Sequence, residues 1–357
     1  NVILLEVYGI ANGIAVDTHA KRISNLRVEE FGHPLDLEIL TPLKEFQATA
    51  KAKEVFVKLW PQVRQETIAL CGSHFHVTQG ACPNLYALAK DVFNTLSIEG
   101  NLPVFYVEEG YHINSYTLKD KENYYIVLTT GAIDRLSSEE IKFLVGHEFG
   151  HLISGHVEFQ LLLAFLPESA RYILRLTELG NKGIRVVSDI ATDTINDTKE
   201  TVDKIKGFIF GKKNDSQKNS SSEREKEQTG ITTGIKNIIG VGDSITRLNK
   251  WNRISEYTAD RIGLLACQDI NVALSTLMKT SGLPQTYYSS ASVDRFIEQV
   301  NEFNDIYGGT YDSILKELDM LDEDHPWMVR RAAELLQWYE SGAYERMLNA
   351  KELPLIK

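Results

Sequence analysis

The segment 147–151, which reads HEFGH, constrains this chain more than any other feature, because it places two imidazoles and a carboxylate on one short stretch. If the stretch is α-helical, His147 and His151 point only about 40° apart, so both rings can reach one metal ion. Glu148 then points about 100° away from His147 and can act as a general base beside the ion rather than bind it. The pattern therefore predicts a helix that carries two metal ligands and one catalytic carboxylate.

The residues around this segment predict the helix that it needs. Ser137 stands three residues before Glu140, which is the spacing of a capping box at a helix start. HEFGH lies late in the helix that this signal begins. The apolar residues with helical spacing are Ile141, Leu144, Val145, Phe149 and Leu152.

A third metal ligand has two candidates. His156 follows His151 by five residues, about 140° around a helix, so we interpret it as a surface histidine or as one that supports a ligand. Glu256 is the better candidate, because it lies in a segment of helical pattern in which Asp260 follows it on the same face. Glu256 can bind the ion, while Asp260 can accept the ring N–H of a ligand histidine.

These motifs together resemble the M48 family of zinc metallopeptidases, which are gluzincins related to the membrane CAAX-processing protease and to the heat-shock protease of bacteria. The combination of HEFGH with Glu256-x-x-x-Asp260 is the most specific part of the resemblance. Residues 128–141 are similar to the strand, glycine turn and helix start that precede HExxH in that family. The resemblance covers residues 100–340 and implies a zincin (gluzincin) fold.

The resemblance also implies the composition of a metal site with one Zn²⁺ per chain. The implied zinc ligands are His147, His151 and Glu256. Glu148 is the implied general base and proton shuttle, and Asp260 is implied to orient His147. Arg253, one turn before Glu256, is expected to be an ion-pair partner next to the ligands.

Two further motifs extend the resemblance. His325-Pro326 with Arg331 is similar to a late HPxxxxR motif of the family, and Asn114 matches a strand motif in which Ser115 replaces the usual alanine. The resemblance implies that His325 donates a hydrogen bond to the developing oxyanion. A helix-capping histidine before a proline is the alternative for that residue. Asn114 is implied to hold the substrate backbone, and Arg331 to support the site structurally.

The rest of the chain predicts a mainly helical α+β fold with a small antiparallel sheet beside the HEFGH helix. After Gly100 the apolar period changes to two, which predicts strands at 104–107, 113–118 and 124–129. Thr41-Pro42 predicts the start of an N-terminal helix. Helical patterns dominate the C-terminal part, at about 248–268, 271–281, 291–307, 311–321 and 326–342.

The segment 211–230 is strongly polar, with no aliphatic or aromatic residue. It cannot bury apolar surface, so we predict a flexible insertion there. The expected organisation is an N-terminal lead-in at 1–40, a helical region at 41–100 packed on the catalytic body, an M48-like peptidase domain at 101–345 and a C-terminal tail at 346–357.

The charge balance also excludes some partners. With 38 basic and 49 acidic residues, the net charge of −11 lacks the positive field that non-specific nucleic-acid binding needs. No stretch reaches the roughly 18 apolar residues of a transmembrane helix. Three cysteines are too few for a disulfide framework and fit a reducing compartment. We therefore expect a soluble, cytoplasmic protein, although the start without Met looks trimmed and leaves a periplasmic or secreted location open.

The motifs favour a zinc-dependent metalloendopeptidase that hydrolyses peptide bonds in extended polypeptides, and two other functions stay open. An aminopeptidase of the gluzincin type needs acidic and glycine-rich motifs upstream of HEFGH that bind a free amine, and the sequence has none. A non-catalytic, chaperone-like zinc protein has no physical need for Glu148. The sequence specifies neither the cleavage preference nor the oligomeric state.

Overall fold

The computed structural model of the protein describes residues 20–47, 50–164, 243–306 and 326–351. The predicted insertion at 211–230, the predicted helix at 311–321 and His325 lie outside the described residues. Within those residues the protein is mainly helical with one small sheet, so the predicted α+β fold class is confirmed. No described helix has the length and apolar character that crossing a membrane requires.

The helix that carries HEFGH and the described helices of the C-terminal part form where the sequence signals predict them. α7 begins with the predicted capping box, in which the Glu140 N–H donates to Ser137 Oγ and the Ser137 N–H donates to the Glu140 carboxylate. It ends at Gly155, whose φ of 74° is left-handed. The described α-helices are α2 (Val28–Phe31), α3 (Pro34–Gln47), α4 (Ala50–Ser73), α5 (Pro83–Thr95), α6 (Thr130–Arg135), α7 (Ser138–Ser154), α8 (Val157–Ala164), α12 (Asp243–Cys267), α13 (Ile270–Thr280), α14 (Val293–Ile306), α16 (Met328–Glu340) and α17 (Ala343–Lys351).

Both ends of the described chain are more helical than the sequence predicts. α3 begins at Pro34, a residue suited to a first helical turn, so Thr41-Pro42 lies inside a helix and the predicted start is wrong. α17 makes residues 346–351 helical where the sequence predicts a tail. Phe31 near one end and Met347 near the other are both buried in the main hydrophobic core. Both terminal segments therefore pack on the central body.

The sheet has four strands in the order β1-β2-β4-β3. They are β1 (Phe75–Val77), β2 (Val104–Glu108), β3 (Ser115–Asp120) and β4 (Asn123–Thr129). β2 and β4 run parallel, with Val104 opposite Tyr125, whereas the other neighbours are antiparallel. The prediction of an antiparallel sheet is therefore wrong, and the sheet is mixed. β4 turns back from β3 as a hairpin and inserts beside β2, which leaves β3 at an edge.

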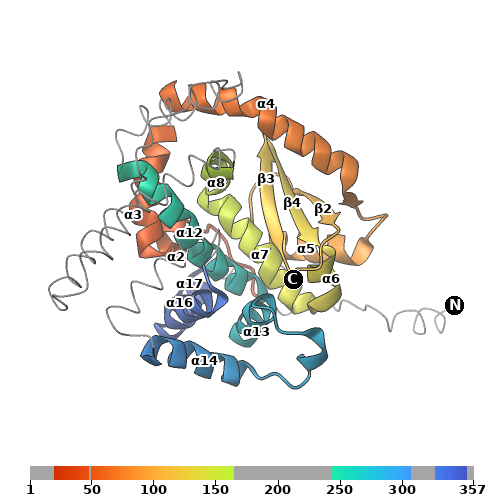
Figure 1. The fold of residues 1–357 in the computed structure, drawn as a ribbon, viewed down its shortest axis with the longest axis vertical. Coiled ribbons are helices and arrows are strands. Elements are labelled where there is room, and N and C mark those ends of the chain that lie inside the picture. The colour runs from red at the N-terminus through yellow and green to blue at the C-terminus, as the bar shows by residue number, and fades with distance from the viewer. Residues whose placement is uncertain (1–19, 48–49, 165–242, 307–325, 352–357) are drawn as a thin grey trace, which may run out of the picture.

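α7 is the central helix of the fold, with the sheet on one side and α12 on the other (Figure 1). Phe105 and Ile126 of the sheet belong to the same buried core as Phe149 of α7. Leu70 of α4 packs with Tyr106, so α4 covers part of the opposite face of the sheet. Because α7 is enclosed in this way, its polar side chains must find partners inside the protein.

α7 and α12 pack closely because glycines lie between them. A Cβ atom at Gly150 would lie 2.7 Å from Ala259 Cα, and one at Gly146 would lie 2.4 Å from Ala266 Cβ. Gly263 of α12 also allows the close approach, since a Cβ atom there would lie 2.9 Å from atoms of Phe143 on α7. These distances are shorter than van der Waals contact, so any larger residue would force the two backbones apart.

Gly150→Ala is expected to lower the free energy of unfolding by about 1–3 kcal/mol, because the added methyl group must push α12 away from α7. The matched control is Gly72→Ala in α4, where a Cβ atom meets nothing within 4 Å. The control should leave stability unchanged or raise it slightly, since alanine favours a helix. Urea unfolding followed by circular dichroism measures both. Equal stability of the two variants would contradict the close helix contact.

Candidate metal centre

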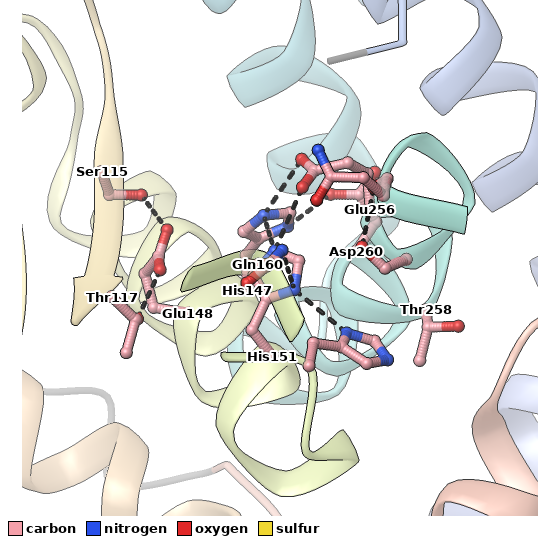
Figure 2. A network of polar contacts seen from close by, with 12 residues as sticks. Ser115, Thr117, His147, Glu148, His151, Gln160, Glu256, Thr258 and Asp260 are labelled. Atoms are coloured by element: carbon pink, nitrogen blue, oxygen red, sulfur yellow. Dashed lines mark hydrogen bonds and ion pairs between the residues drawn. The ribbon is translucent and has the colours of Figure 1, made fainter. Parts of the chain in front are cut away.

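Two histidines of α7 and one glutamate of α12 converge on one point (Figure 2). The Nε2 atoms of His147 and His151 lie 3.1 Å apart. The two Glu256 carboxylate oxygens lie 3.4 Å from His147 Nε2 and 3.2 Å from His151 Nε2. All three side chains are at most 5% exposed. Three such polar atoms repel one another in a buried site unless a cation or a proton lies between them.

The spacing of these atoms fits a zinc ion. Ligands about 2.0–2.2 Å from a tetrahedral zinc lie about 3.3–3.6 Å from one another, close to the three distances observed. Two imidazoles and one carboxylate are also a ligand set of catalytic zinc sites, in which a fourth position stays open. The structure therefore brings the three predicted ligands together in an arrangement that could hold the predicted metal.

Asp260 and Arg331 lie directly behind this cluster. His147 Nδ1 lies 2.9 Å from Asp260 Oδ1, so the ring can donate to that carboxylate and keep the Nε2 lone pair for an ion. Arg331 binds Asp260 with two hydrogen bonds of 2.5 and 2.8 Å, and its Nη1 lies 3.3 Å from Glu256. Burial acts to raise the pKa of Asp260, but the Arg331 guanidinium outweighs it and holds the pKa below its usual range.

The two ligand histidines differ in their proton affinity. Burial and the charge of Arg331 act to lower the pKa of His147. The contacts of the ring with Asp260 and Glu256 outweigh both, and the pKa rises to about 9. At His151 burial dominates and keeps the pKa below its ordinary value. In the ion-free protein His147 therefore holds a proton at neutral pH, and a metal ion must displace that proton.

Glu148 points to the other side of α7, toward the edge strand β3 (Figure 2). Ser115 Oγ donates a 2.5 Å hydrogen bond to Glu148 Oε1, and Thr117 Oγ1 donates a 2.6 Å hydrogen bond to Oε2. Residues two apart on a strand share a face, so one strand supplies both donors. The sequence motifs did not predict these two hydroxyl groups. The available signal was their alternate spacing in the predicted strand 113–118.

A cleft of about 340 Å³ lies between β3 and α7, with Glu148 and the three clustered residues among its walls. Asn114 is exposed at the start of β3 and also lines the cleft. Arg331 reaches the cleft from α16. Arg253 lies half-buried on α12, one turn before Glu256, and its predicted ion-pair role stays a prediction. The other residues that line the cleft are mostly apolar, among them Ile113, Leu144, Leu277 and Met328.

Comparison with known proteins finds similar metallopeptidases. The sequence model of peptidase family M48 matches residues 83–339. The chain is 23% identical over 332 residues to the plastoglobule-localized metallopeptidase 48 of Arabidopsis thaliana chloroplasts, covering 91% of this chain and 76% of that protein. The crystal structure of S. mikatae Ste24p matches with 13% identity and a TM-score of 0.38. That match covers 94% of this chain and 65% of the Ste24p chain, so this chain spans less than two thirds of it.

Zinc affinity is expected to depend on pH through His147. Because zinc must displace a proton from a group with a pKa of about 9, apparent affinity should rise about tenfold per pH unit between pH 7 and 9 and then level off. Competition with a chromophoric zinc chelator across this pH range measures the slope. Asp260→Asn should flatten it, since the carboxylate that raises the pKa is lost. An affinity of the wild type that does not change between pH 7 and 9 would contradict the protonated state of His147.

Proposed function

The chain belongs to peptidase family M48, and from this we propose that it is a zinc-dependent endopeptidase that cleaves extended polypeptides. Zinc-dependent proteolysis is the activity that the family and its metallopeptidase relative support. One observation carries the finer proposal: His147, His151 and Glu256 converge beside a cleft in which Glu148 is held by two hydroxyl groups.

We assign zinc to His147, His151 and Glu256, with Asp260 orienting His147. When bound, zinc supplies a Lewis acid that polarises a carbonyl and lowers the pKa of water toward 7. Arg331 is proposed to keep Asp260 ionised and the carboxylate of Glu256 in place, through the contacts described above. Its contribution is therefore to hold the ligands rather than to react.

Glu148 is proposed as the general base. Its carboxylate accepts one hydrogen bond at each oxygen, from Ser115 and from Thr117, and these bonds hold it in place beside the cluster. In this role Glu148 takes the proton of the attacking water and delivers it to the nitrogen of the leaving amine. His325 is proposed to donate to the developing oxyanion, in accordance with the family motif.

The substrate is proposed to bind along β3. This strand is at an edge of the sheet and forms one wall of the cleft, so its outer backbone groups can pair with an extended peptide as an added strand. Asn114, at the start of the strand, is proposed to bind the substrate backbone. A strand-like substrate accounts for the preference for extended polypeptides over folded ones.

Endopeptidase action is favoured over aminopeptidase action by the charges in the cleft. Among the described residues that line it, Glu148 and Glu256 are the only carboxylates, and both already have roles at the metal site. A further carboxylate, which would bind the free amine of a substrate N-terminus, is not found among them. A non-catalytic zinc protein would not need the two hydroxyl groups that hold Glu148.

Glu148→Gln is expected to retain zinc and to lower cleavage of denatured casein by about 10²- to 10⁴-fold, because the amide cannot accept the water proton. The control is Glu298→Gln on α14, where the carboxylate pairs with Arg295 and neither residue lines the cleft. The control should cleave like the wild type. Zinc content is measured on the same samples. Cleavage by Glu148→Gln at the wild-type rate would overturn the assigned mechanism.

A peptide with an acetylated N-terminus separates the two peptidase functions. We expect the wild type to cleave it internally, since the proposed site does not need a free amine, and mass spectrometry of the products identifies the cleaved bonds. The same peptide without the acetyl group is the control and should give the same fragments. Cleavage of only the unblocked peptide, one residue at a time, would show an aminopeptidase instead.

A further inference from the structure

A second buried carboxylate lies behind His151, connected to it through His156. His151 Nδ1 lies 3.1 Å from His156 Nδ1, and His156 Nε2 lies 3.1 Å from Asp36 Oδ2. Asp36 and His156 are both fully buried. The helical geometry expected from the sequence turns His156 away from His151. The ring nevertheless returns to His151 because Gly155 ends α7 in a left-handed turn, in which the His156 N–H donates to the His151 carbonyl.

The hydrogen bonds around Asp36 determine which group donates and which accepts in the contacts from Asp36 through His156 to His151. Trp251 Nε1 donates to Asp36 Oδ1 at 2.8 Å. Thr258 Oγ1 accepts from a backbone N–H, and its own proton goes to Asp36 Oδ2 at 2.5 Å. Burial acts to raise the pKa of Asp36, but the contact with the His156 ring, followed by the hydrogen bonds from Thr258 and Trp251, keeps it below its usual range. Asp36 is therefore an ionised acceptor, and His156 Nε2 must carry the proton that faces it.

The proton on His156 Nε2 determines the tautomer of His151. A neutral His156 with its proton on Nε2 has a lone pair on Nδ1. That lone pair accepts the proton of His151 Nδ1, which leaves the lone pair of His151 on Nε2. This is the atom that faces His147 Nε2 and Glu256. Gln160 Nε2 also lies 3.2 Å from His151 Nδ1. With the amide turned over, its oxygen would accept the same proton, so Gln160 is the competing partner that an experiment must separate.

We propose that Asp36 and His156 are positioning residues that hold His151 in the orientation and tautomer needed to bind zinc, as Asp260 does for His147. The inference rests on the zinc site of the proposed function. Each ligand histidine then has its own buried carboxylate, in direct contact for His147 and through a second imidazole for His151. Asp36 lies on α3, before the residues 83–339 that match the family. The N-terminal helix is thereby part of the metal site.

Zinc affinity of the full chain tests this proposal. Asp36→Asn and His156→Ala should each weaken zinc binding by about 10- to 100-fold in competition with a chromophoric chelator, the usual loss when a supporting partner of a ligand histidine is removed. His156→Asn should bind almost like the wild type, because its Oδ1 can accept from His151 Nδ1. The structural control is Thr67→Val on α4, which removes a buried side-chain hydrogen bond to the Val63 carbonyl and does not line the cleft. It should keep wild-type affinity.

Thermal unfolding of the zinc-free variants separates loss of the ligand geometry from loss of the fold. If Asp36→Asn does not fold, the comparison of His156→Ala with His156→Asn still tests the proposal. Both variants lose the imidazole ring, but only His156→Asn keeps an acceptor for His151 Nδ1, so only His156→Ala should bind zinc weakly. Equal zinc affinity of the wild type, His156→Ala and Asp36→Asn would overturn the proposal while leaving the zinc site intact. Weak zinc binding by Gln160→Met together with normal zinc binding by His156→Ala would also overturn the proposal. That result would show that the Gln160 amide, and not His156, holds His151.

The tautomers are also measured directly, without zinc. Long-range ¹H–¹⁵N NMR spectra of histidine-labelled, zinc-free protein should show His151 with its proton on Nδ1 and His156 with its proton on Nε2. His156→Asn identifies the His156 signals by their loss. The opposite tautomers would overturn the proposal. A wild type that binds no zinc at pH 9 would contradict the proposed function, whereas these spectra would still decide whether Asp36 and His156 set the state of His151.

Discussion

The close contact between α7 and α12 brings the residues of the metal cluster together. Gly146 and Gly150 let α12 approach α7, and this approach brings Glu256 to the two histidines although the residues are distant in sequence. The same contact buries the cluster completely. Buried charges cost several kcal/mol each unless they are paired, so the fold must supply partners at the same place. It does so from α3, α16 and the turn after α7.

The charges in direct contact with the cluster are paired. In the ion-free protein the protonated His147 and Arg331 face Asp260 and Glu256, two positive charges against two negative ones. A bound zinc ion would replace one proton and add one positive charge, and Glu148 is the further carboxylate that lines the same cleft. The arrangement therefore suits a divalent ion bound by neutral imidazoles and one carboxylate, and it accounts for a cluster that is stable both with a proton and with a metal.

Local signals in the sequence were sufficient for the helix that carries the site. Ser137 and Glu140 predicted its start, and the spacing of His147 and His151 predicted two metal ligands on one helix face. Glu256 was implied by the resemblance to the M48 family, and the structure brings it to the two histidines. Non-local pairing could not be predicted in the same way. The insertion of β4 between β2 and β3 depends on which strand edge is available after folding, and β1 is too short to give a pattern. The contact between His156 and His151 was not predicted, because helical spacing no longer applies beyond the left-handed turn at Gly155.

Anomalous diffraction at the zinc absorption edge, from crystals of the full chain grown with zinc, locates the metal ion. We expect one strong peak per chain, about 2.0–2.2 Å from the Nε2 atoms of His147 and His151 and from the Glu256 carboxylate. A peak at another place, or full occupancy of a site from which Glu256 points away, would contradict this expectation.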